Sequence, residues 1–329
     1  MAVQLGIIGT GRIAHAHASG VKTNPEAELV SVHDVAGDIA AAFAEKYGCE
    51  SADVDTIAGD PSIDGVLICT PTPTHAMLIE KFARAGKHVF CEKPVDLDIG
   101  RAIEVVEIAK EAGVKLMLGF NRRFDPNFAA VRAAIDDGTI GDVELVLITS
   151  RDPEPPPVSY AKESGGLYRD MTIHDLDMAR FMLGEEPVVV SAHGAVLVTP
   201  GIEEFGDIDT ASVILETATG KQAVITNSRR ATYGYDQRVE VHGSLGVAAA
   251  ENQHEPGAVI GNAGGYTRPP LQNFFMDRYI PAYTNEIRAF VKSIAEDVEP
   301  PATGEDGIIA LRMADACFES LKTGKRVEI

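Results

Sequence analysis

Residues 3–14 read VQLGIIGTGRIA, an apolar run followed directly by a glycine-rich turn. The pattern Gly9-x-Gly11-x-x-Ala14 is the GxGxxA loop that joins a buried strand to a helix in dinucleotide-binding folds. Gly9 permits the tight turn, Gly11 lets the backbone approach a pyrophosphate, and the small Ala14 lets the helix pack close to the strand. The stretch therefore predicts a phosphate-binding turn at the N-terminal end of a helix.

A second apolar run, residues 28–34, ends in Asp34, about twenty residues beyond the loop. An acid at this place accepts hydrogen bonds from the ribose hydroxyls of the cofactor, and its charge repels a 2′-phosphate. The sequence therefore predicts NAD rather than NADP. Arg12, within the loop, would offset part of this repulsion if its side chain reached the ribose.

Apolar strands and amphipathic helices alternate through the first third of the chain. The expected elements are a helix at 36–47, strands at 65–70, 87–91 and 115–119, and helices at 75–85 and 97–112. This alternation predicts a doubly wound parallel sheet, the Rossmann architecture, in a first domain of residues 1–121.

Polar segments follow two of these strands at the edge where such sheets bind ligands. One is Thr70-Pro-Thr-Pro-Thr-His75 and the other is Glu92-Lys93-Pro94. The competing interpretations are a proline-rich turn with Thr74 capping the next helix, and a surface lysine at position 93. The predicted cofactor contacts are Gly9, Gly11, Arg12, Ile13, Asp34, Thr70, Pro71, Thr72, His75, Glu92 and Lys93.

The pattern changes from about residue 122. A short helix at 127–137 precedes strand-like runs at 143–149, 188–198, 210–216, 222–227 and 237–242, and two helices close the chain at 283–296 and 305–322. Successive strands predict an open, largely antiparallel sheet, so residues 122–329 are expected to form an α+β domain whose final helix can pack back on the first domain. Val213, Leu215 and Val224 are expected on one exposed face of that sheet, as a natural oligomer interface.

Residues 169–181 read RDMTIHDLDMARF and put polar side chains where a helix would be apolar. As a helix, the stretch places Asp170, His174 and Asp177 on one face at i, i+4 and i+7. A solvated helix face with a stray histidine is the competing interpretation. The preceding residues 151–165 are proline-rich and are predicted to form a loop without helix or strand.

The composition excludes several classes of partner. The formal net charge of −20 repels nucleic-acid phosphates and anionic membrane surfaces. No apolar run approaches the roughly eighteen residues of a membrane span, and the N-terminus shows no basic leader. Four cysteines without CxxC pairing indicate a reducing compartment. A cytoplasmic protein with a small-molecule partner is expected.

The motifs together resemble the Gfo/Idh/MocA oxidoreductases over nearly the whole chain. The resemblance is carried by GTGRIA, Asp34, CTPTPTH, CEKP, GFNRRFDP and GGLYRDMTIHDLDMARF, while SRDPEPPP, NSRRATYGYDQRVEVHGS and FFMDRYIPAY are similar to the inositol 2-dehydrogenase branch. It implies catalytic roles for Lys93, Asp170 and His174, and a cis peptide before Pro94 that aims Lys93 into the cleft. It also implies tetramers joined through the open sheet. The implied substrate contacts are Lys93, Arg151, Asp170, His174, Asp177, Tyr233 and Tyr235.

The implied reaction is NAD-dependent oxidation of a secondary alcohol in a cyclic polyol, with myo-inositol the first choice. His174 would accept the hydroxyl proton, Lys93 would stabilise the developing alkoxide, and Asp170 would bind the ammonium or orient the substrate. Asp177 would bind neighbouring hydroxyls, and Asp175 is expected to be a solvated or helix-stabilising neighbour.

Three alternatives stay open. The substrate can be scyllo-inositol, glucose or another cyclic sugar. The chain can be a catalytically silent NAD-sensing protein on the same fold. His174 with Asp170, Asp175 and Asp177 can form a metal site for hydrolysis, although no metal is the favoured expectation.

Overall fold

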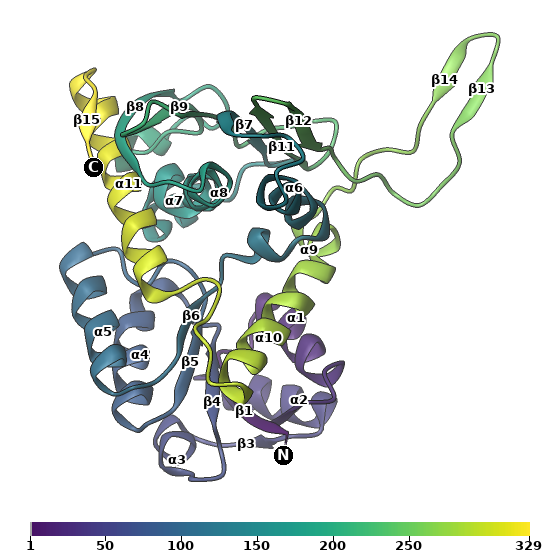
Figure 1. The fold of residues 1–329 in the computed structure, drawn as a ribbon. Coiled ribbons are helices and arrows are strands. Elements are labelled where there is room, and N and C mark those ends of the chain that lie inside the picture. Colours follow the sequence, from purple (N-terminus) through teal and green to yellow (C-terminus); the bar gives the residue numbers. More distant parts are fainter. Residues whose placement is uncertain (1) are drawn as a thin grey trace. The chain divides into compact units, whose positions relative to one another are not determined.

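The computed structural model describes residues 2–329 (Figure 1). The chain divides into two compact units. The first comprises the described residues through Asp125 together with Ile280–Leu311, and the second comprises Pro126–Tyr279 together with Arg312–Ile329. The segment Ile280–Leu311, from the C-terminal part of the chain, therefore belongs to the first unit. The predicted first domain of residues 1–121 did not include this segment.

The first unit is built on a six-stranded sheet in the order β3-β2-β1-β4-β5-β6, with every pair parallel. The central strand β4 is buried throughout, and its neighbour β1 is buried except at Gln4, because helices cover both faces of such a sheet. The order is that of the Rossmann fold, which confirms the predicted architecture. The strands are β1 (Val3–Ile8), β2 (Ala27–His33), β3 (Glu50–Ser51), β4 (Gly65–Ile68), β5 (His88–Cys91) and β6 (Leu116–Leu118).

Local capping sets the ends of several helices in this unit. Asp53 and Asp98 accept from the backbone N–H of Thr56 and Arg101, each at 2.8 Å, and so begin α3 and α5. Late in the chain, α10 packs on α1, where Gly20 leaves room for Ile287. The helices are α1 (Arg12–Lys22), α2 (Gly37–Tyr47), α3 (Val54–Gly59), α4 (His75–Arg84), α5 (Ile99–Glu111) and α10 (Ile280–Ala295), with 3₁₀ turns η1 (Thr72–Thr74) and η2 (Asn121–Phe124).

The second unit is built on a seven-stranded sheet in the order β12-β11-β7-β10-β9-β8-β15. Only β7 and β10 pair in parallel and the other neighbours are antiparallel, which confirms an open, largely antiparallel sheet. The strands are β7 (Val143–Arg151), β8 (Pro187–Ala195), β9 (Thr210–Thr217), β10 (Gln222–Ser228), β11 (Asp236–Gly243), β12 (Gly246–Ala250) and β15 (Val327–Glu328).

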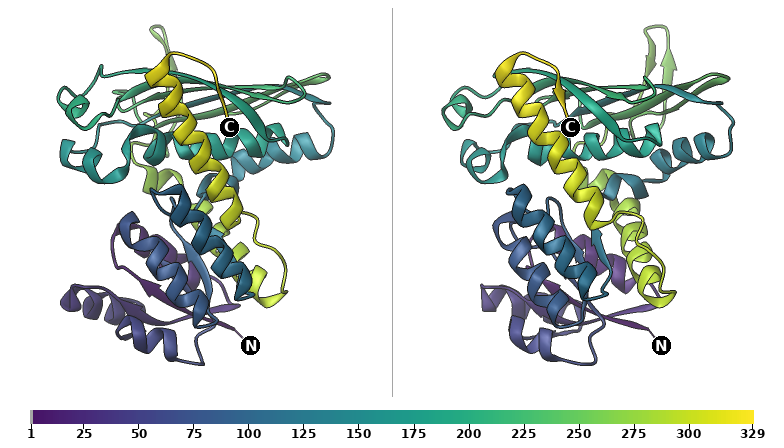
Figure 2. Two further views of the ribbon diagram at one scale, coloured as in Figure 1. Left: turned by 90° about the vertical axis from the view of Figure 1, so that its left-hand side faces the viewer. Right: turned by 60° about the vertical axis from the view of Figure 1, so that its left-hand side comes forward.

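Helices of the second unit lie against one face of this sheet (Figure 2). Within the unit, α6 contacts β11 and β12, while α8 contacts β7 and β10. The helical elements are α6 (Pro126–Asp136), α7 (Val158–Ser164), the π-helical turn η3 (Tyr168–Thr172), α8 (Ile173–Leu183), the 3₁₀ turn η4 (Ile202–Phe205), α9 (Phe275–Arg278) and α11 (Gly304–Thr323). The residues of α11 belong to the first unit up to Leu311 and to the second from Arg312.

The prediction of one exposed face carrying Val213, Leu215 and Val224 is wrong. Val213 and Leu215 are buried on the helix-covered face of β9. Val224 is paired in register with Ile214, whose side chain is 42% exposed, and these two residues belong to the opposite face. Alternation along a strand identifies two faces, but the register between strands decides which residues share one.

Two further local expectations are corrected. The segment 151–165 contains the helix α7, because its prolines end at Pro157, which immediately precedes the helix, and Gly165 then ends it with φ of 81°. Residues 169–181 are helical but start within η3, where the wider π-helical spacing changes the relation between Asp170 and the residues of α8.

The chain between β12 and α9 forms an arm that sequence patterns did not predict. Its tip is a two-stranded hairpin, β13 (Ile260–Asn262) with β14 (Gly265–Thr267), and both strands are exposed (Figure 1). Within residues 2–329, none of the helices combines the length and apolar character that crossing a bilayer requires.

Candidate active site

The glycine loop of the first unit has the geometry that its sequence predicts. Gly9 adopts φ of +90°, and a Cβ there would lie 2.9 Å from backbone atoms of Cys69 and Thr70, so only glycine fits. Gly11 is the N-cap of α1, and a Cβ on it would meet nothing within 4 Å. The backbone at Gly11 is thus open to a pyrophosphate at the positive end of the helix dipole.

Asp34 is fixed beside this loop by three hydrogen bonds. Its Oδ2 accepts from the backbone N–H and the hydroxyl of Thr10, both at 2.7 Å, and its Oδ1 accepts from the Ala36 N–H at 3.0 Å. Partial burial favours a higher pKa for Asp34, but the hydrogen bonds from Ala36 and Thr10 outweigh it and keep this pKa below its ordinary value. The carboxylate therefore stays ionised and has lone pairs left for a ribose hydroxyl.

The polar segment after β4 forms the turn η1 and then enters α4. Thr74 does not cap α4 with its side chain. Its hydroxyl instead donates to Thr70 Oγ1 at 2.7 Å and lies 2.8 Å from the Pro71 carbonyl oxygen. The capping expectation is therefore wrong, because the 3₁₀ turn directs the hydroxyl back to the strand end. Thr70 and Thr72 are half-buried and Pro71 is exposed.

His75 joins the ends of β4 and β5. It is 1% exposed, and its Nδ1 and Nε2 lie 2.7 and 2.8 Å from the carbonyl oxygens of Pro94 and Thr70. Burial lowers the pKa of His75, although both backbone contacts act in the opposite direction. Both ring nitrogens lie against backbone carbonyl oxygens. This favours a role for His75 in holding the two loops together rather than the predicted role in contacting the cofactor.

Lys93 precedes Pro94 through a cis peptide bond, as the family resemblance implies. On its other side, Glu92 is held by the buried His17, whose Nε2 lies 2.7 Å from Glu92 Oε1. Buried histidines of the same unit therefore hold the side chain of Glu92 before Lys93 and the backbone carbonyl of Pro94 after it.

In the second unit, Asp170 is anchored by two groups that sequence reasoning did not assign. Arg229 Nη2 donates to Asp170 Oδ2 at 2.6 Å, and the Tyr160 hydroxyl donates to Asp170 Oδ1 at 3.1 Å. Arg229 also pairs with Asp152 at 2.9 Å. Burial opposes the charge of Arg229, but the two carboxylates outweigh it and raise its pKa. Arg229 lies within NSRRATYGYDQRVEVHGS, one of the stretches that carry the family resemblance, yet no local pattern identifies it as the partner of Asp170.

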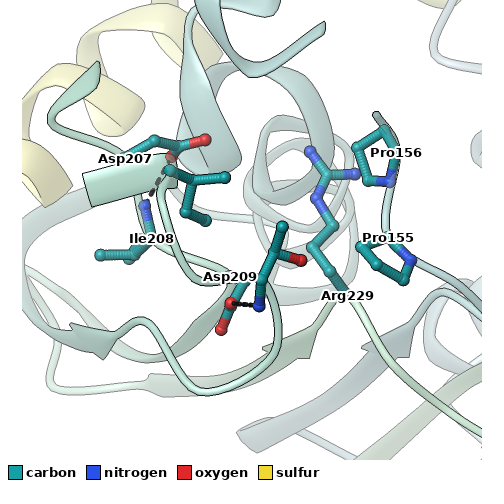
Figure 3. Close-up of a pocket in the computed structure, with 8 residues that line it drawn as sticks. Pro155, Pro156, Asp207, Ile208, Asp209 and Arg229 are labelled. Carbon is teal, nitrogen blue, oxygen red and sulfur yellow. Dashed lines mark hydrogen bonds between the residues drawn. The ribbon is translucent and has the colours of Figure 1, made fainter. Parts of the chain in front are cut away.

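Arg229 also lines a small pocket beside the proline loop (Figure 3). Pro155 and Pro156 lie on one side of its guanidinium, and Asp207 and Asp209 belong to the same pocket. Burial raises the pKa of Asp207, while its bonds to the Leu167 and Ile208 N–H groups act against this.

The acidic residues of 169–181 differ in accessibility. Asp170 and His174 are partly exposed, whereas Asp175 and Asp177 are 0% and 1% exposed. Asp175 accepts from Asn227 Nδ2 at 2.8 Å, so the expectation of a solvated Asp175 is wrong. Asp177 lies 4.0 Å from Arg180 Nη1. Only Asp170 and His174 of these four side chains retain appreciable surface for a ligand.

The remaining predicted substrate residues separate into a pair and an outlier. Arg151 Nη1 donates to the Tyr233 hydroxyl at 2.8 Å, and that hydroxyl donates to Asp236 Oδ2 at 2.6 Å. Tyr233 is 52% exposed and is available to a ligand. Tyr235 is buried, with its ring perpendicular to that of Tyr279 at 6.0 Å. The structure thus brings Arg151 and Tyr233 together and places Tyr235 in the core.

Among residues 2–329, no three His, Cys, Asp or Glu side chains gather in an arrangement that could hold a metal ion. The proposed metal set of His174 with Asp170, Asp175 and Asp177 is divided between partly exposed and buried side chains.

Comparisons with known proteins agree along the whole chain. The chain is 56% identical over 329 residues to inositol 2-dehydrogenase of Rhizobium meliloti, with 100% of each chain covered. Its fold is similar to the crystal structure of a myo-inositol dehydrogenase from Corynebacterium glutamicum, with TM-score 0.96, 42% identity and 100% and 99% of the two chains covered. It is also similar to scyllo-inositol dehydrogenase from Lactobacillus casei with bound NAD(H) and scyllo-inositol, with TM-score 0.91, 31% identity and 100% and 99% covered.

Family models match both parts of the sequence. Residues 3–120 match the oxidoreductase family with an NAD-binding Rossmann fold, and residues 128–249 match the GFO/IDH/MocA C-terminal domain. These matches agree with the parallel sheet of the first unit and the mixed sheet of the second. The chain therefore belongs to the Gfo/Idh/MocA family of oxidoreductases.

Proposed function

We propose that this protein is an NAD-dependent dehydrogenase that oxidises one secondary alcohol of a cyclic polyol, with myo-inositol converted to 2-keto-myo-inositol (scyllo-inosose). The observation that carries the proposal is the 56% identity to an inositol 2-dehydrogenase over the full length of both chains. The reaction gives the protein a place in inositol catabolism. The four free cysteines, three of them buried, fit a protein of the reducing cytoplasm.

The first unit fits NAD. Gly11 leaves the N-terminus of α1 open to a pyrophosphate, and the ionised Asp34 is fixed where ribose hydroxyls can donate to it. The same negative charge disfavours a 2′-phosphate. NAD held by this loop and Asp34 would supply the hydride acceptor for the alcohol carbon.

Residues of the chain itself accept the proton and stabilise the negative charge that develops on the substrate oxygen. As the C–H bond breaks, the O–H proton leaves to a base, and the electron pair of the O–H bond forms the carbonyl. We assign the base to His174, whose imidazole titrates near neutrality in ordinary surroundings. We assign Lys93 to the stabilisation of negative charge on the substrate oxygen, which is strongest in the transition state.

Asp170 orients the substrate in this proposal. Its carboxylate is held by Arg229 and Tyr160, so it presents acceptor lone pairs in a fixed direction. Arg151 and Tyr233 supply further polar contacts to ring hydroxyls, while the buried Asp177 is a weaker candidate for such a contact.

The proposal is tested by initial rates of NAD and NADP reduction across a panel of inositols and aldoses. We expect myo-inositol with NAD to give the highest kcat/KM. Absence of NAD reduction with any inositol would contradict the proposal.

Two alternatives are separated by the same panel. The similarity to a structure containing scyllo-inositol favours that isomer as the second candidate substrate, followed by glucose and related sugars. A catalytically silent NAD sensor would bind NADH fully and turn over none of the panel. A sensor of this kind would not need a lysine and a partly exposed histidine suited to proton transfer, so the presence of Lys93 and His174 favours the enzyme.

We also propose that the protein is a homotetramer assembled through the uncovered face of the second unit's sheet. Ile214 and Val224 are neighbours on that face, and Leu147, also half-buried, is paired in register with Val224. These three apolar side chains lie across adjacent strands, and a continuous apolar strip of this kind is typical of an interface between subunits.

A further inference from the structure

A second cavity of the second unit lies beside the π-helical turn that carries Asp170. Its volume is about 410 Å³, within the range of roughly 300–1,000 Å³ that is usual for small-molecule sites. Asp170 and His174 are not among the described residues that line it, so it is separate from the side chains assigned to the reaction. Apart from glycines, the lining consists of Arg169, Phe205, Asp207, Asp315 and Phe318, all within the second unit.

An arginine and an aspartate form the polar wall of this cavity. Arg169 Nε donates to Asp315 Oδ1 at 2.8 Å, and Arg169 Nη2 lies 2.6 Å from the same oxygen. The two side chains are 28% and 33% exposed, so the pair is accessible to a ligand. Asp315 Oδ2 accepts no hydrogen bond from residues 2–329. The wall therefore presents N–H donors of the guanidinium beside an acceptor oxygen of the carboxylate.

A second carboxylate, that of Asp207 after η4, adds another acceptor. Its Oδ1 accepts from the backbone N–H groups of Leu167 and Ile208, both at 2.8 Å. Its Oδ2 accepts no hydrogen bond from the part of the chain that the structure describes, although Asp207 is only 8% exposed. A Cβ on Gly166 would lie 2.7 Å from Asp207 Oδ1, so glycine leaves this carboxylate its place. An acceptor in a largely buried residue that lacks a protein donor calls for a donor from a ligand or from water.

Two phenylalanines supply the apolar surface of the cavity. Phe318, on α11, lies edge-on to the ring of Tyr168 at 4.9 Å and beneath the guanidinium of Arg169 at 5.5 Å. Phe205, in η4, is exposed. One ring therefore holds the arginine in place, whereas the other is open to a ligand. An open ring beside fixed polar groups can pack on the C–H face of a ring whose hydroxyls bond to those groups.

The charges of the cavity disfavour ionic ligands. Asp207 and Asp315 outnumber Arg169, and the chain as a whole has a formal charge of −20, so an anion is repelled. A cation would have to displace the guanidinium that already contacts Asp315 and Phe318. A neutral ligand with several hydroxyls can instead accept from the guanidinium and donate to both carboxylates. A polyol therefore satisfies all the polar groups of the cavity at once.

We propose that this cavity is a second binding site for a neutral polyol. The hydroxyls of the polyol bond to Arg169, Asp315 and Asp207. Its C–H face packs on the open ring of Phe205. This site takes a ligand of the same chemical class as the proposed substrate, at a place where the ligand is bound without being oxidised.

A polyol in this cavity also acts on the turn that carries Asp170. Arg169 directly precedes Asp170 in η3, and Asp207 holds the N–H of Leu167 just before that turn. Asp207 also lines the small pocket of Arg229, the partner of Asp170 (Figure 3). Occupancy of the cavity therefore changes the rate of oxidation. Only this effect on the rate rests on the proposed function.

Equilibrium dialysis of the full chain against labelled myo-inositol, with and without NADH, tests the site. We expect the wild type to bind one mole per mole of chain more than Phe205→Ala and Asp315→Ala do, whether or not the catalytic site is filled. Each variant removes one contact and should weaken binding in the cavity about tenfold or more. Phe205→Ala alters an exposed side chain, so its fold should be retained.

Matched control variants alter similar side chains elsewhere in the second unit. Tyr266→Ala removes an exposed ring from the hairpin strand β14, and Glu319→Ala removes an exposed carboxylate from α11. Both should bind as much myo-inositol as the wild type. Putrescine and inorganic phosphate serve as cationic and anionic probes. Neither should displace, at tenfold excess, the myo-inositol that Phe205→Ala fails to bind.

The effect on the rate is measured with NAD over the range of myo-inositol concentrations that fills the cavity. We expect the initial rates of the wild type and of Glu319→Ala to depart from a single hyperbola, and those of Phe205→Ala to follow one. If the wild type oxidises no inositol, the proposed function is contradicted. The difference of one mole in the dialysis experiment still decides whether the cavity binds a polyol.

The inference is overturned if the wild type binds no more myo-inositol than Phe205→Ala and Asp315→Ala, or if the control variants lose the same binding. Displacement of the additional myo-inositol by putrescine or phosphate would overturn the assignment to a neutral polyol. A single hyperbola in an active wild type would overturn the effect on the rate. If Asp315→Ala does not fold, Phe205→Ala and its control Tyr266→Ala decide the outcome.

Discussion

Arg229 donates to Asp170 across 2.6 Å although the two residues are 59 positions apart in the sequence. The guanidinium also pairs with Asp152, so one buried cation fixes the π-helical turn and the start of the proline loop together. Because Arg229 is itself held by two carboxylates, Asp170 keeps a set direction.

Arg229→Met should therefore reduce both activity and stability. Removing one member of a buried ion pair typically costs about 3–5 kcal/mol, because the remaining charges lose their partner. We expect kcat with the preferred polyol to fall on the order of a hundredfold as Asp170 loses its direction. Steady-state rates and urea unfolding measure the two effects. An exposed arginine in the same unit, changed in Arg326→Met, is the control; equal behaviour of both variants would refute the role of Arg229.

Lys93→Ala tests the assignment of charge stabilisation. Preorganised groups of this kind contribute about 3–4 kcal/mol, so kcat should fall on the order of a hundredfold or more. The rate of NAD reduction at saturating substrate measures it. Lys81→Ala removes a lysine at the surface of α4 that pairs with the exposed Asp55, and should have no effect. A kcat for Lys93→Ala near that of the wild type would exclude the assignment.

Asp34→Ser should shift cofactor preference toward NADP. The variant removes the charge that repels a 2′-phosphate, and a change of about 1.4 kcal/mol would alter the ratio of kcat/KM values for the two cofactors tenfold. Asp34→Asn is the matched variant, because its amide oxygen can still accept from Thr10. An unchanged ratio in both variants would show that Asp34 does not discriminate between the cofactors.

Glu286→Gln should stabilise the fold more at pH 8 than at pH 5. Glu286 is buried on α10, and burial raises its folded-state pKa above its ordinary value of 4.5, so the folded wild type binds more protons than the unfolded chain. Its stability contribution is present below that value and is lost as pH rises through the interval up to the raised pKa. The amide of the variant does not titrate, so denaturant unfolding of both proteins at the two pH values gives the difference. A gain that is independent of pH would contradict a neutral Glu286.

Ile214→Asp should dissociate the proposed tetramer into smaller species. The change places a charge in the apolar strip of the uncovered sheet face, where burial in an interface would leave it without a partner. Light scattering after size-exclusion chromatography measures the mass. Glu203→Gln alters an exposed residue of η4 and serves as the control. A wild-type monomer, or an Ile214→Asp variant with unchanged mass, would refute assembly through this face.

The sequence was most informative where the determining pattern is local. Residues 3–14 and Asp34 predicted the strand, the turn, the helix and the choice of NAD, because the glycines and the acid occur at fixed spacings along the chain in this motif. The family resemblance also directed attention to Lys93, and the cis peptide before Pro94 agrees with it.

Such local patterns could not predict which side chains distant in the sequence become hydrogen-bond partners in the fold. Asp175 and Asp170 look alike in the sequence, yet one is buried against Asn227 and the other is partly exposed beside Arg229. The π-helical turn and the packing of α8 on the sheet make that distinction, and neither follows from helical periodicity.

Local sequence patterns were enough to predict an NAD-binding Rossmann unit followed by an open, largely antiparallel sheet, since strand and helix periods are properties of neighbouring residues. Tertiary structure decided which residues face the core, as with Leu215 and Val224, and which groups hold Asp170 and Glu92. The physical reason is that strand register and buried hydrogen bonds join residues tens of positions apart.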